Sequence, residues 1–140
     1  MTGDEEVMGT ERLRVLVVED EVAIARAVVT YLQRAGFDVI STQSGDTAIN
    51  YMKREHVDIL LVDLRIPDMR GDIVFESGAA HQPQLRHQTI FMTGDLSERA
   101  MDLVHWCNCP VLPKPFELAT MLAMVNAVAP RRDNNGMRSA

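Results

Sequence analysis

The segment Val57-Asp-Ile-Leu-Leu-Val62, which runs directly into Asp63, decides the fold of this chain. It is a nearly unbroken aliphatic run, as is typical of a strand that is covered on both faces inside a parallel sheet. Pro67 and Gly71 follow, and these residue types favour a loop over a regular continuation of the strand. We therefore expect a buried strand at residues 57–62 that delivers Asp63 to a polar loop.

Four further apolar runs predict the rest of the sheet. They occupy residues 13–18, 37–41, 89–92 and 111–112, and segments with helical periodicity lie between them. This alternation, without an internal repeat or a linker, indicates an α/β domain with five strands and about five helices.

Most of the helices have recognisable beginnings or apolar stripes. The first combines a single stripe with a terminating glycine, in the residues Ile24, Ala27, Val28, Tyr31, Leu32, Ala35 and Gly36. Ser44 and Ser97 are typical N-cap residues of two further helices, and the last helix carries an apolar stripe between Leu118 and Val128.

The helix expected to begin near Asp72 is the exception. Gly78 and Pro83 interrupt its pattern early, and residues 79–88 are largely polar. We therefore expect a short helix here, with a longer loop as the alternative.

Length and composition fit a single globular domain. The 140 residues are 46% hydrophobic and 24% charged, and the aperiodic ends predict tails at residues 1–11 and 130–140 around a domain at residues 12–129. A net charge of -6 disfavours direct binding to nucleic acid. The sequence contains no apolar run of membrane-spanning length and no secretory signal, so we expect a cytoplasmic protein with no membrane contact.

Polar residues follow the predicted strands at the points where they end. Because helical crossovers make the strands parallel, these ends meet at one edge of the sheet, where ligands bind in open parallel sheets. The residues at the strand ends are Glu19, Asp20, Asp63, Thr93 and Lys114. We expect the functional site at this edge.

The residue types at this edge predict phosphoryl chemistry. If the first and third strands are neighbours, about 4.8 Å apart, their three carboxylates crowd one pocket and favour a hard divalent cation such as Mg²⁺. The Thr93 hydroxyl can donate a hydrogen bond to a phosphoryl oxygen, and the Lys114 ammonium can neutralise its charge. A carboxylate is then the natural covalent acceptor.

Four segments of the chain resemble the receiver domain of two-component response regulators. They are Val17-Val-Glu-Asp-Glu21, Leu61-Val-Asp-Leu-Arg-Ile-Pro67 with Gly71, Phe91-Met-Thr-Gly94 and Leu112-Pro-Lys-Pro-Phe116. The resemblance covers about residues 12–129, and it implies a flavodoxin-like fold, a doubly wound five-stranded parallel sheet with strand order 2-1-3-4-5.

The resemblance also implies roles for the residues at the strand ends. Asp63 is the expected phosphoacceptor, with a histidine kinase or a histidine phosphotransfer protein as the donor. Glu19, Asp20, Asp63 and the backbone carbonyl of Arg65 are the expected ligands of Mg²⁺. Thr93 and Lys114 form the expected switch pair, and the peptide bond between Lys114 and Pro115 is a candidate for the cis form.

Three positions of the pocket region set this chain apart. The family often has an aromatic residue three positions before its lysine, where this chain has Val111, so an aromatic toggle is not expected. Arg65 lies two residues after Asp63, and Asp95 lies two residues after Thr93. We expect them to pair across the pocket, to obstruct the attacking water and to slow hydrolysis of the phosphoaspartate.

Two other functions remain open. A phosphorylation-independent adaptor of the same fold usually lacks part of the acidic pocket, which is complete here. A Mg²⁺-dependent phosphohydrolase with an aspartyl-phosphate intermediate expects a second acid two residues after its nucleophile, where this chain has Arg65. The chain is expected to be a signalling phosphoacceptor rather than an enzyme that turns over a substrate.

No segment of the sequence identifies the partner through which the domain would pass on its signal. The output partner is unknown, a phosphorylation-dependent homodimer is one form that the resemblance allows, and the chain is either a stand-alone regulator or part of a hybrid kinase or larger regulator. His105, Cys107 and Cys109 lack the second half of a zinc motif and are expected to serve packing or loop placement. Trp106 is either a partner anchor or a half-buried residue at a helix end.

Overall fold

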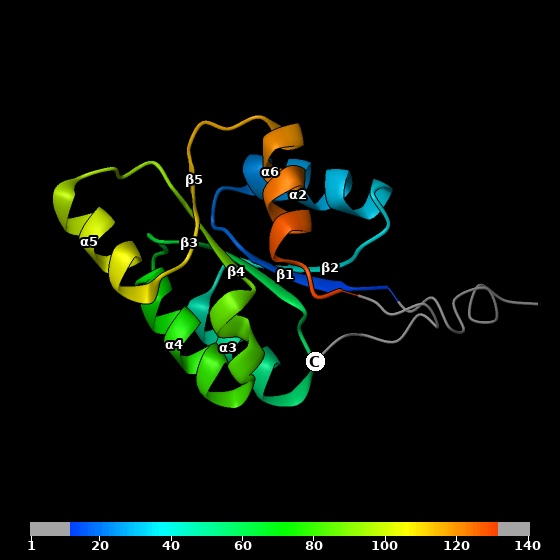
Figure 1. Ribbon diagram of the computed structural model, residues 1–140, viewed down its shortest axis with the longest axis horizontal. Coiled ribbons are helices and arrows are strands. Elements are labelled where there is room, and N and C mark those ends of the chain that lie inside the picture. The colour runs from blue at the N-terminus through cyan, green and yellow to red at the C-terminus, as the bar shows by residue number, and fades with distance from the viewer. Residues whose placement is uncertain (1–11, 132–140) are drawn as a thin grey trace, which may run out of the picture.

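The computed structural model describes residues 12–131. Within this range five strands form one parallel sheet in the order β2-β1-β3-β4-β5, which is the predicted order (Figure 1). The strands are β1 (Arg14–Val18), β2 (Asp38–Thr42), β3 (Ile59–Asp63), β4 (Thr89–Thr93) and β5 (Val111–Pro113). The tail predicted at residues 1–11 and residues 132–140 of the second one lie outside the described residues.

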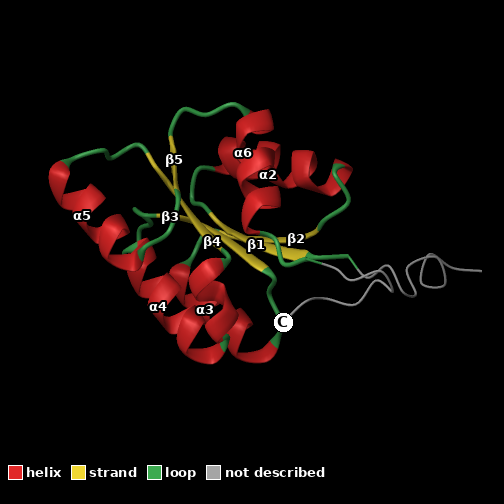
Figure 2. Ribbon diagram, viewed as in Figure 1, coloured by secondary structure: helices red, strands yellow, loops and turns green. Residues whose placement is uncertain are grey.

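Five α-helices within the described range cover the two faces of the sheet (Figure 2). They are α2 (Val22–Arg34), α3 (Gly45–Arg54), α4 (Gly71–His81), α5 (Glu98–Cys107) and α6 (Leu118–Val128), and a 3₁₀ helix, η1 (Pro83–His87), follows α4. One buried cluster joins the sheet to α3, α4 and α5, and a second joins it to α2 and α6. No helix of residues 12–131 is long and apolar enough to cross a bilayer.

The central strand of the sheet is covered by helices on both faces. All five residues of β3 are buried, as its aliphatic sequence predicts, because α4 packs on one face of the sheet and α2 and α6 pack on the other. Along the chain, β2 and β3 begin one and two residues later than predicted, a shift within the usual uncertainty of element ends. Each shifted strand therefore includes the polar residue at its end.

The helix predicted to begin near Asp72 is present, but the prediction that Gly78 interrupts it is wrong. Helix α4 continues through Gly78 to His81, and the separate helix η1 begins at Pro83 where a longer loop was the alternative. The reason for a glycine here is tertiary packing: a Cβ atom at Gly78 would lie 2.6 Å from the sulfur of Met52 in α3. Gly78 therefore permits the close approach of two helices.

Local signals at the other helix ends act as predicted. The Ser44 hydroxyl accepts a hydrogen bond from the N–H of Thr47 at 3.1 Å, and the Ser97 hydroxyl accepts one from Ala100 at 3.2 Å. Gly36, just after α2, has a φ of 100°, which is a left-handed conformation that favours glycine.

Strand register brings the expected site residues to one edge. Val18 of β1 pairs with Val62 of β3, so the residues that follow them leave the sheet side by side. Thr93, the last residue of β4, pairs with Pro113 of β5, and the N–H of Lys114 donates to the Thr93 carbonyl at 2.8 Å. The peptide bond between Lys114 and Pro115 is cis, as the resemblance suggested.

Candidate functional site

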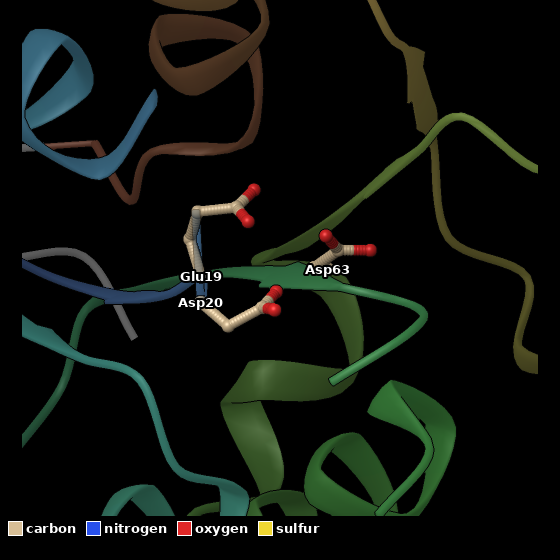
Figure 3. Close-up of side chains that lie close together, drawn as sticks. All are labelled: Glu19, Asp20 and Asp63. Atoms are coloured by element: carbon tan, nitrogen blue, oxygen red, sulfur yellow. The ribbon is translucent and has the colours of Figure 1, made fainter. Parts of the chain in front are cut away.

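Three carboxylates meet at the ends of β1 and β3. One oxygen from each of Glu19, Asp20 and Asp63 lies within 4.8 Å of the others, and Figure 3 shows the side chains reaching toward a common space. Glu19 and Asp63 are buried, whereas Asp20 is partly exposed. The predicted convergence of acids from two separate loops is therefore present.

The Asp63 carboxylate is held from two sides. Its Oδ1 accepts a hydrogen bond from the backbone N–H of Arg65 at 2.9 Å, and its Oδ2 accepts one from Lys114 Nζ at 2.6 Å. The backbone contact fixes the orientation of the carboxylate, because it spans only two residues. Asp63 lines a pocket together with Asp20, Glu21 and Lys114.

Lys114 is the cation of the pocket. Its ammonium also lies 2.7 Å from Oε1 of Glu19 and 3.3 Å from Oε1 of Glu21. Burial lowers the pKa of this ammonium, but the contacts with Asp63 and Glu19 outweigh that effect, so the pKa of Lys114 is raised. The side chain therefore stays charged throughout the physiological range.

One lysine does not neutralise the carboxylates around it. Burial raises the pKa of Glu19, and the nearby Lys114 ammonium opposes that rise only in part. Among the described residues, Glu19 Oε1 is a buried oxygen without a well-directed hydrogen bond. An all-oxygen pocket with excess negative charge and such an atom fits a hard divalent cation like Mg²⁺.

The Thr93 hydroxyl is engaged within its own loop. It accepts a hydrogen bond from the N–H of Asp95 at 2.9 Å, and it lies 3.3 Å from the Asp95 carbonyl oxygen as a donor. The sequence predicted a hydroxyl directed at a phosphoryl group. To donate to a phosphoryl oxygen, the Thr93 hydroxyl must turn its proton away from the Asp95 carbonyl.

Arg65 and Asp95 form the predicted ion pair across the mouth of the pocket. Nε of Arg65 donates to Oδ2 of Asp95 at 2.8 Å, and the terminal guanidinium nitrogen Nη2 contacts the same oxygen. The hydroxyl and backbone N–H of Ser97, together with Arg65, lower the pKa of Asp95 to about 2. The pair is therefore fully charged at neutral pH.

Comparison with known proteins identifies the family. The family described as the response regulator receiver domain matches residues 15–126, which include every residue of the pocket. The chain belongs to the response regulator receiver family.

Curated relatives of this receiver chain are longer regulators. The transcriptional regulatory protein CutR of Streptomyces coelicolor is 32% identical over 119 residues, which are 85% of this chain and 54% of that protein. The cell cycle response regulator CtrA of Brucella ovis is 27% identical over 121 residues, which are 85% of this chain and 51% of the regulator. The chain therefore spans about half the length of the curated relatives it matches.

Solved receiver structures share the fold. A CheY-like receiver domain protein from Methanospirillum hungatei superposes with a TM-score of 0.78 at 21% identity, over 84% of this chain and 93% of that one. The chemotaxis protein CheY4 of Vibrio cholerae gives a TM-score of 0.75 at 24% identity, over 84% and 98% of the two chains.

Asp68 is a site-supporting residue of this receiver domain that the sequence analysis missed. Its carboxylate accepts hydrogen bonds from the N–H groups of Gly45 and Asp46, each at 3.0 Å, and from the Ser44 hydroxyl at 3.1 Å. These contacts lower the pKa of Asp68 and fasten the loop after Asp63 to the start of α3. An acid next to Pro67 was the only local signal, and it does not identify the helix that it caps.

The two thiols pack against the core, in agreement with the expectation of packing roles. Burial raises the pKa of Cys107 to about 11 and that of Cys109 to about 12, so both remain protonated. Both pack against the core cluster beneath α5. Trp106, by contrast, is 86% exposed on α5.

Proposed function

We propose that this receiver domain takes a phosphoryl group from a phosphohistidine donor onto Asp63 and that the modification changes its affinity for a partner. The geometry around Asp63 supports this proposal most directly, because Asp63 lines the pocket and its Oδ2 contacts Lys114 at 2.6 Å. In the reaction, an Asp63 oxygen forms a bond to phosphorus while the bond between phosphorus and the donor imidazole nitrogen breaks. The imidazole leaves with the electron pair of that bond and takes up a proton.

The residues around Asp63 have separate tasks in this reaction. The N–H of Arg65 holds the carboxylate in place through Oδ1, so little orientational freedom is lost on reaction. Lys114 offers its charge to an oxygen of the transferred group, where negative charge must be neutralised. Thr93 supplies a hydroxyl donor once it has turned away from Asp95.

Mg²⁺ is the cofactor that we propose for this pocket. Glu19, Asp20 and Asp63 would hold it through carboxylate oxygens, with the backbone carbonyl of Arg65 as a further proposed ligand. When bound, the ion supplies neutralisation of the negative charge on the phosphoryl oxygens.

The partners follow from the same proposal. The donor would be a histidine kinase or a histidine phosphotransfer protein, and the chain would act in the cytoplasm as a signalling component rather than as an enzyme with a turned-over substrate. Its partner on the output side would recognise the phosphorylated or the unphosphorylated form.

Phosphorylation by a small donor tests the proposed acceptor. The chain is incubated with acetyl phosphate and Mg²⁺, and intact mass is followed for the wild type, Asp63→Asn and Asp46→Asn. We expect an adduct of about 80 Da, one phosphoryl group, on the wild type and on Asp46→Asn but not on Asp63→Asn. An adduct on Asp63→Asn, or none on the wild type with Mg²⁺ in excess, would contradict the proposal.

A further inference from the structure

We propose that the cleft between α5 and the loop joining β3 to α4 binds an acidic segment of a partner protein, and binds it best while Asp63 is unphosphorylated. The second half of this inference rests on the proposed function. The first half concerns only the shape and charge of the cleft.

The cleft is a cavity of about 310 Å³ with an apolar floor. Leu64 and Ala100, both buried, and the half-buried Leu103 contribute this floor. In Figure 1, α5 lies at the outer end of the helix layer formed with α3 and α4, and the β4–α5 loop runs out toward the start of α5. Ser97 and Arg99, which also line the cavity, are exposed, so an aliphatic or aromatic side chain of a partner can enter it from solvent.

Arginines surround this floor. Arg65, Arg70 and Arg99 line the cleft, and Asp95 is the single acidic residue that lines it. This local excess of positive charge is the reverse of the chain as a whole, whose net charge is -6. Charge complementarity therefore selects an acidic partner segment rather than a basic one.

The three arginines are not equally available. Arg65 pairs with Asp95, and Arg70 pairs with Asp72 at 3.0 Å. Arg99 is exposed and forms no ion pair or hydrogen bond with the described residues, so its guanidinium is free to bind a carboxylate. Arginine in such a position commonly contributes much of the binding energy of an interface.

Two exposed apolar residues stand close in the sequence to residues that line the cleft. Leu96 is 54% exposed and lies between two lining residues, Asp95 and Ser97. Trp106 is exposed one helical turn beyond Leu103, on the same side of α5. An acidic segment that also carries an aliphatic or aromatic residue would cover these side chains, and such an anchor is typical of protein interfaces.

The cleft shares a wall with the acidic pocket. Arg65 and Asp95 line both cavities, so their ion pair is the boundary between the cleft and Asp63. A phosphoryl group on Asp63 replaces the single negative charge of the carboxylate with about two, so about one negative charge is added on the far side of this boundary. At a separation of about 10 Å in water, this charge would weaken the binding of one carboxylate about twofold.

Selection from a random peptide library tests the occupant. The full chain, without phosphodonor, is immobilised and exposed to displayed random peptides of about twelve residues, a length that spans a cleft of this kind. The enriched peptide is then labelled with fluorescein, and its affinity is measured by anisotropy for the wild type, Arg99→Glu and Arg26→Glu. Arg26 is an exposed residue of α2 on the opposite face, so it is a control with the same change of charge.

We expect the enriched peptides to be acidic and to contain an aliphatic or aromatic residue. Arg99→Glu should weaken binding about tenfold, which corresponds to about 1.4 kcal/mol, whereas Arg26→Glu should change it less than about twofold. The absence of enriched acidic peptides, or equal losses in the two variants, would overturn the proposal. Self-association that Arg99→Glu abolishes, without acidic peptide binding, would place a second copy in the cleft and would also overturn it.

Beryllofluoride, a stand-in for the phosphoryl group, tests the second half separately. Relative to Mg²⁺ alone, Mg²⁺ with beryllofluoride should give about twofold weaker peptide binding to the wild type and no change for Asp63→Asn, as the added charge predicts. Tighter binding would overturn the proposed dependence on phosphorylation. Failure of the acetyl phosphate experiment would reject the proposed function but leave the peptide result for the unphosphorylated chain intact.

Discussion

The ammonium of Lys114 lies 2.6 Å from Oδ2 of Asp63, although 51 positions separate the two residues in the sequence. The contact exists because β3 and β5 end at the same edge of the sheet, on either side of β4. It places a fixed positive charge where a phosphoryl group on Asp63 would carry negative charge. Because Lys114 also compensates the charge of a buried carboxylate, the same contact should affect the stability of the domain as well as its function.

Lys114→Met should destabilise the metal-free domain. The substitution leaves Glu19 and Asp63 buried without their cation, and removal of one partner from a buried ion pair commonly costs about 3 kcal/mol or more. Urea unfolding with and without Mg²⁺ measures the effect, with the exposed Lys53→Met as the control. We expect Mg²⁺ to restore part of the loss, and equal stability of Lys114→Met and the wild type without metal would contradict this prediction.

Glu19→Gln should stabilise the domain in the absence of metal at neutral pH. Because the pKa of Glu19 is raised on folding, the group favours the folded state below its unfolded pKa and loses that contribution as the pH rises through the folded value. The neutral variant avoids this cost, and a gain of about 1 kcal/mol would raise the melting temperature by about 4 °C.

Thermal melts of wild type, Glu19→Gln and the exposed control Glu117→Gln, with and without Mg²⁺, check the role of Glu19. We expect Mg²⁺ to stabilise the wild type more than Glu19→Gln, because the variant has lost a carboxylate from the pocket. A lower melting temperature of metal-free Glu19→Gln than of the wild type would show that the carboxylate is not a net cost to folding.

Arg65→Ala should accelerate loss of the phosphoryl group from Asp63. The Arg65–Asp95 ion pair lies across the mouth of the pocket, and its removal opens a path for the attacking water. The rate is measured by the decay of the phosphorylated mass after the donor is removed, with Arg70→Ala as the control. Decay at the wild-type rate would refute a role for Arg65 in hydrolysis.

Ser97→Ala should raise the pKa of Asp95 from about 2 toward its ordinary value, because the Ser97 hydroxyl is the largest cause of the shift. The depressed pKa gives stability that is present above the unfolded pKa and is lost as the pH falls through about 2. Carboxyl-carbon NMR of Asp95 between low and neutral pH measures the midpoint in wild type, Ser97→Ala and the remote control Ser41→Ala. An unchanged midpoint in Ser97→Ala would assign the shift to the backbone N–H of Ser97 and to Arg65 instead.

Gly71→Ala should destabilise the domain, whereas Gly94→Ala should be tolerated. A Cβ atom at Gly71 would overlap the carbonyl oxygen of Asp63 and lie 2.9 Å from Cα of Leu64, and backbone atoms cannot yield as a flexible side chain can. A Cβ atom at Gly94 would meet only Lys114 Cβ, at 3.9 Å. Overpacking of this kind costs about 1–3 kcal/mol, and urea unfolding of the two variants measures the difference. Equal stabilities of the two variants would show that the loop after Asp63 rearranges to accommodate the added methyl group.

The sequence predicts the sheet and the acidic pocket because their signals are local. The aliphatic run before Asp63 identifies a buried strand, and parallel topology then determines where the strand ends meet. The contact between Arg65 and Asp95 is predictable for the same reason, since each residue stands two positions beyond a strand end.

Features that depend on packing between elements cannot be predicted from the sequence alone. In the sequence, Gly78 predicts a break in the helix. In the structure, Met52 lies where a Cβ atom at this position would be, so the close packing of α3 and α4 requires glycine here. Asp68 caps α3 from a loop more than 20 positions away, so no periodicity links it to Gly45. The engagement of the Thr93 hydroxyl with Asp95 depends on the conformation of one loop, which residue types alone do not specify.

Trp106 is the only tryptophan of the chain and is 86% exposed. The tryptophan fluorescence of this protein therefore reports on the surface of α5 rather than on the core. An indole that already contacts water in the folded state changes little in emission when the core unfolds, and it is readily reached by a collisional quencher. Fluorescence will therefore report on what covers or moves α5, and global unfolding is better followed by circular dichroism.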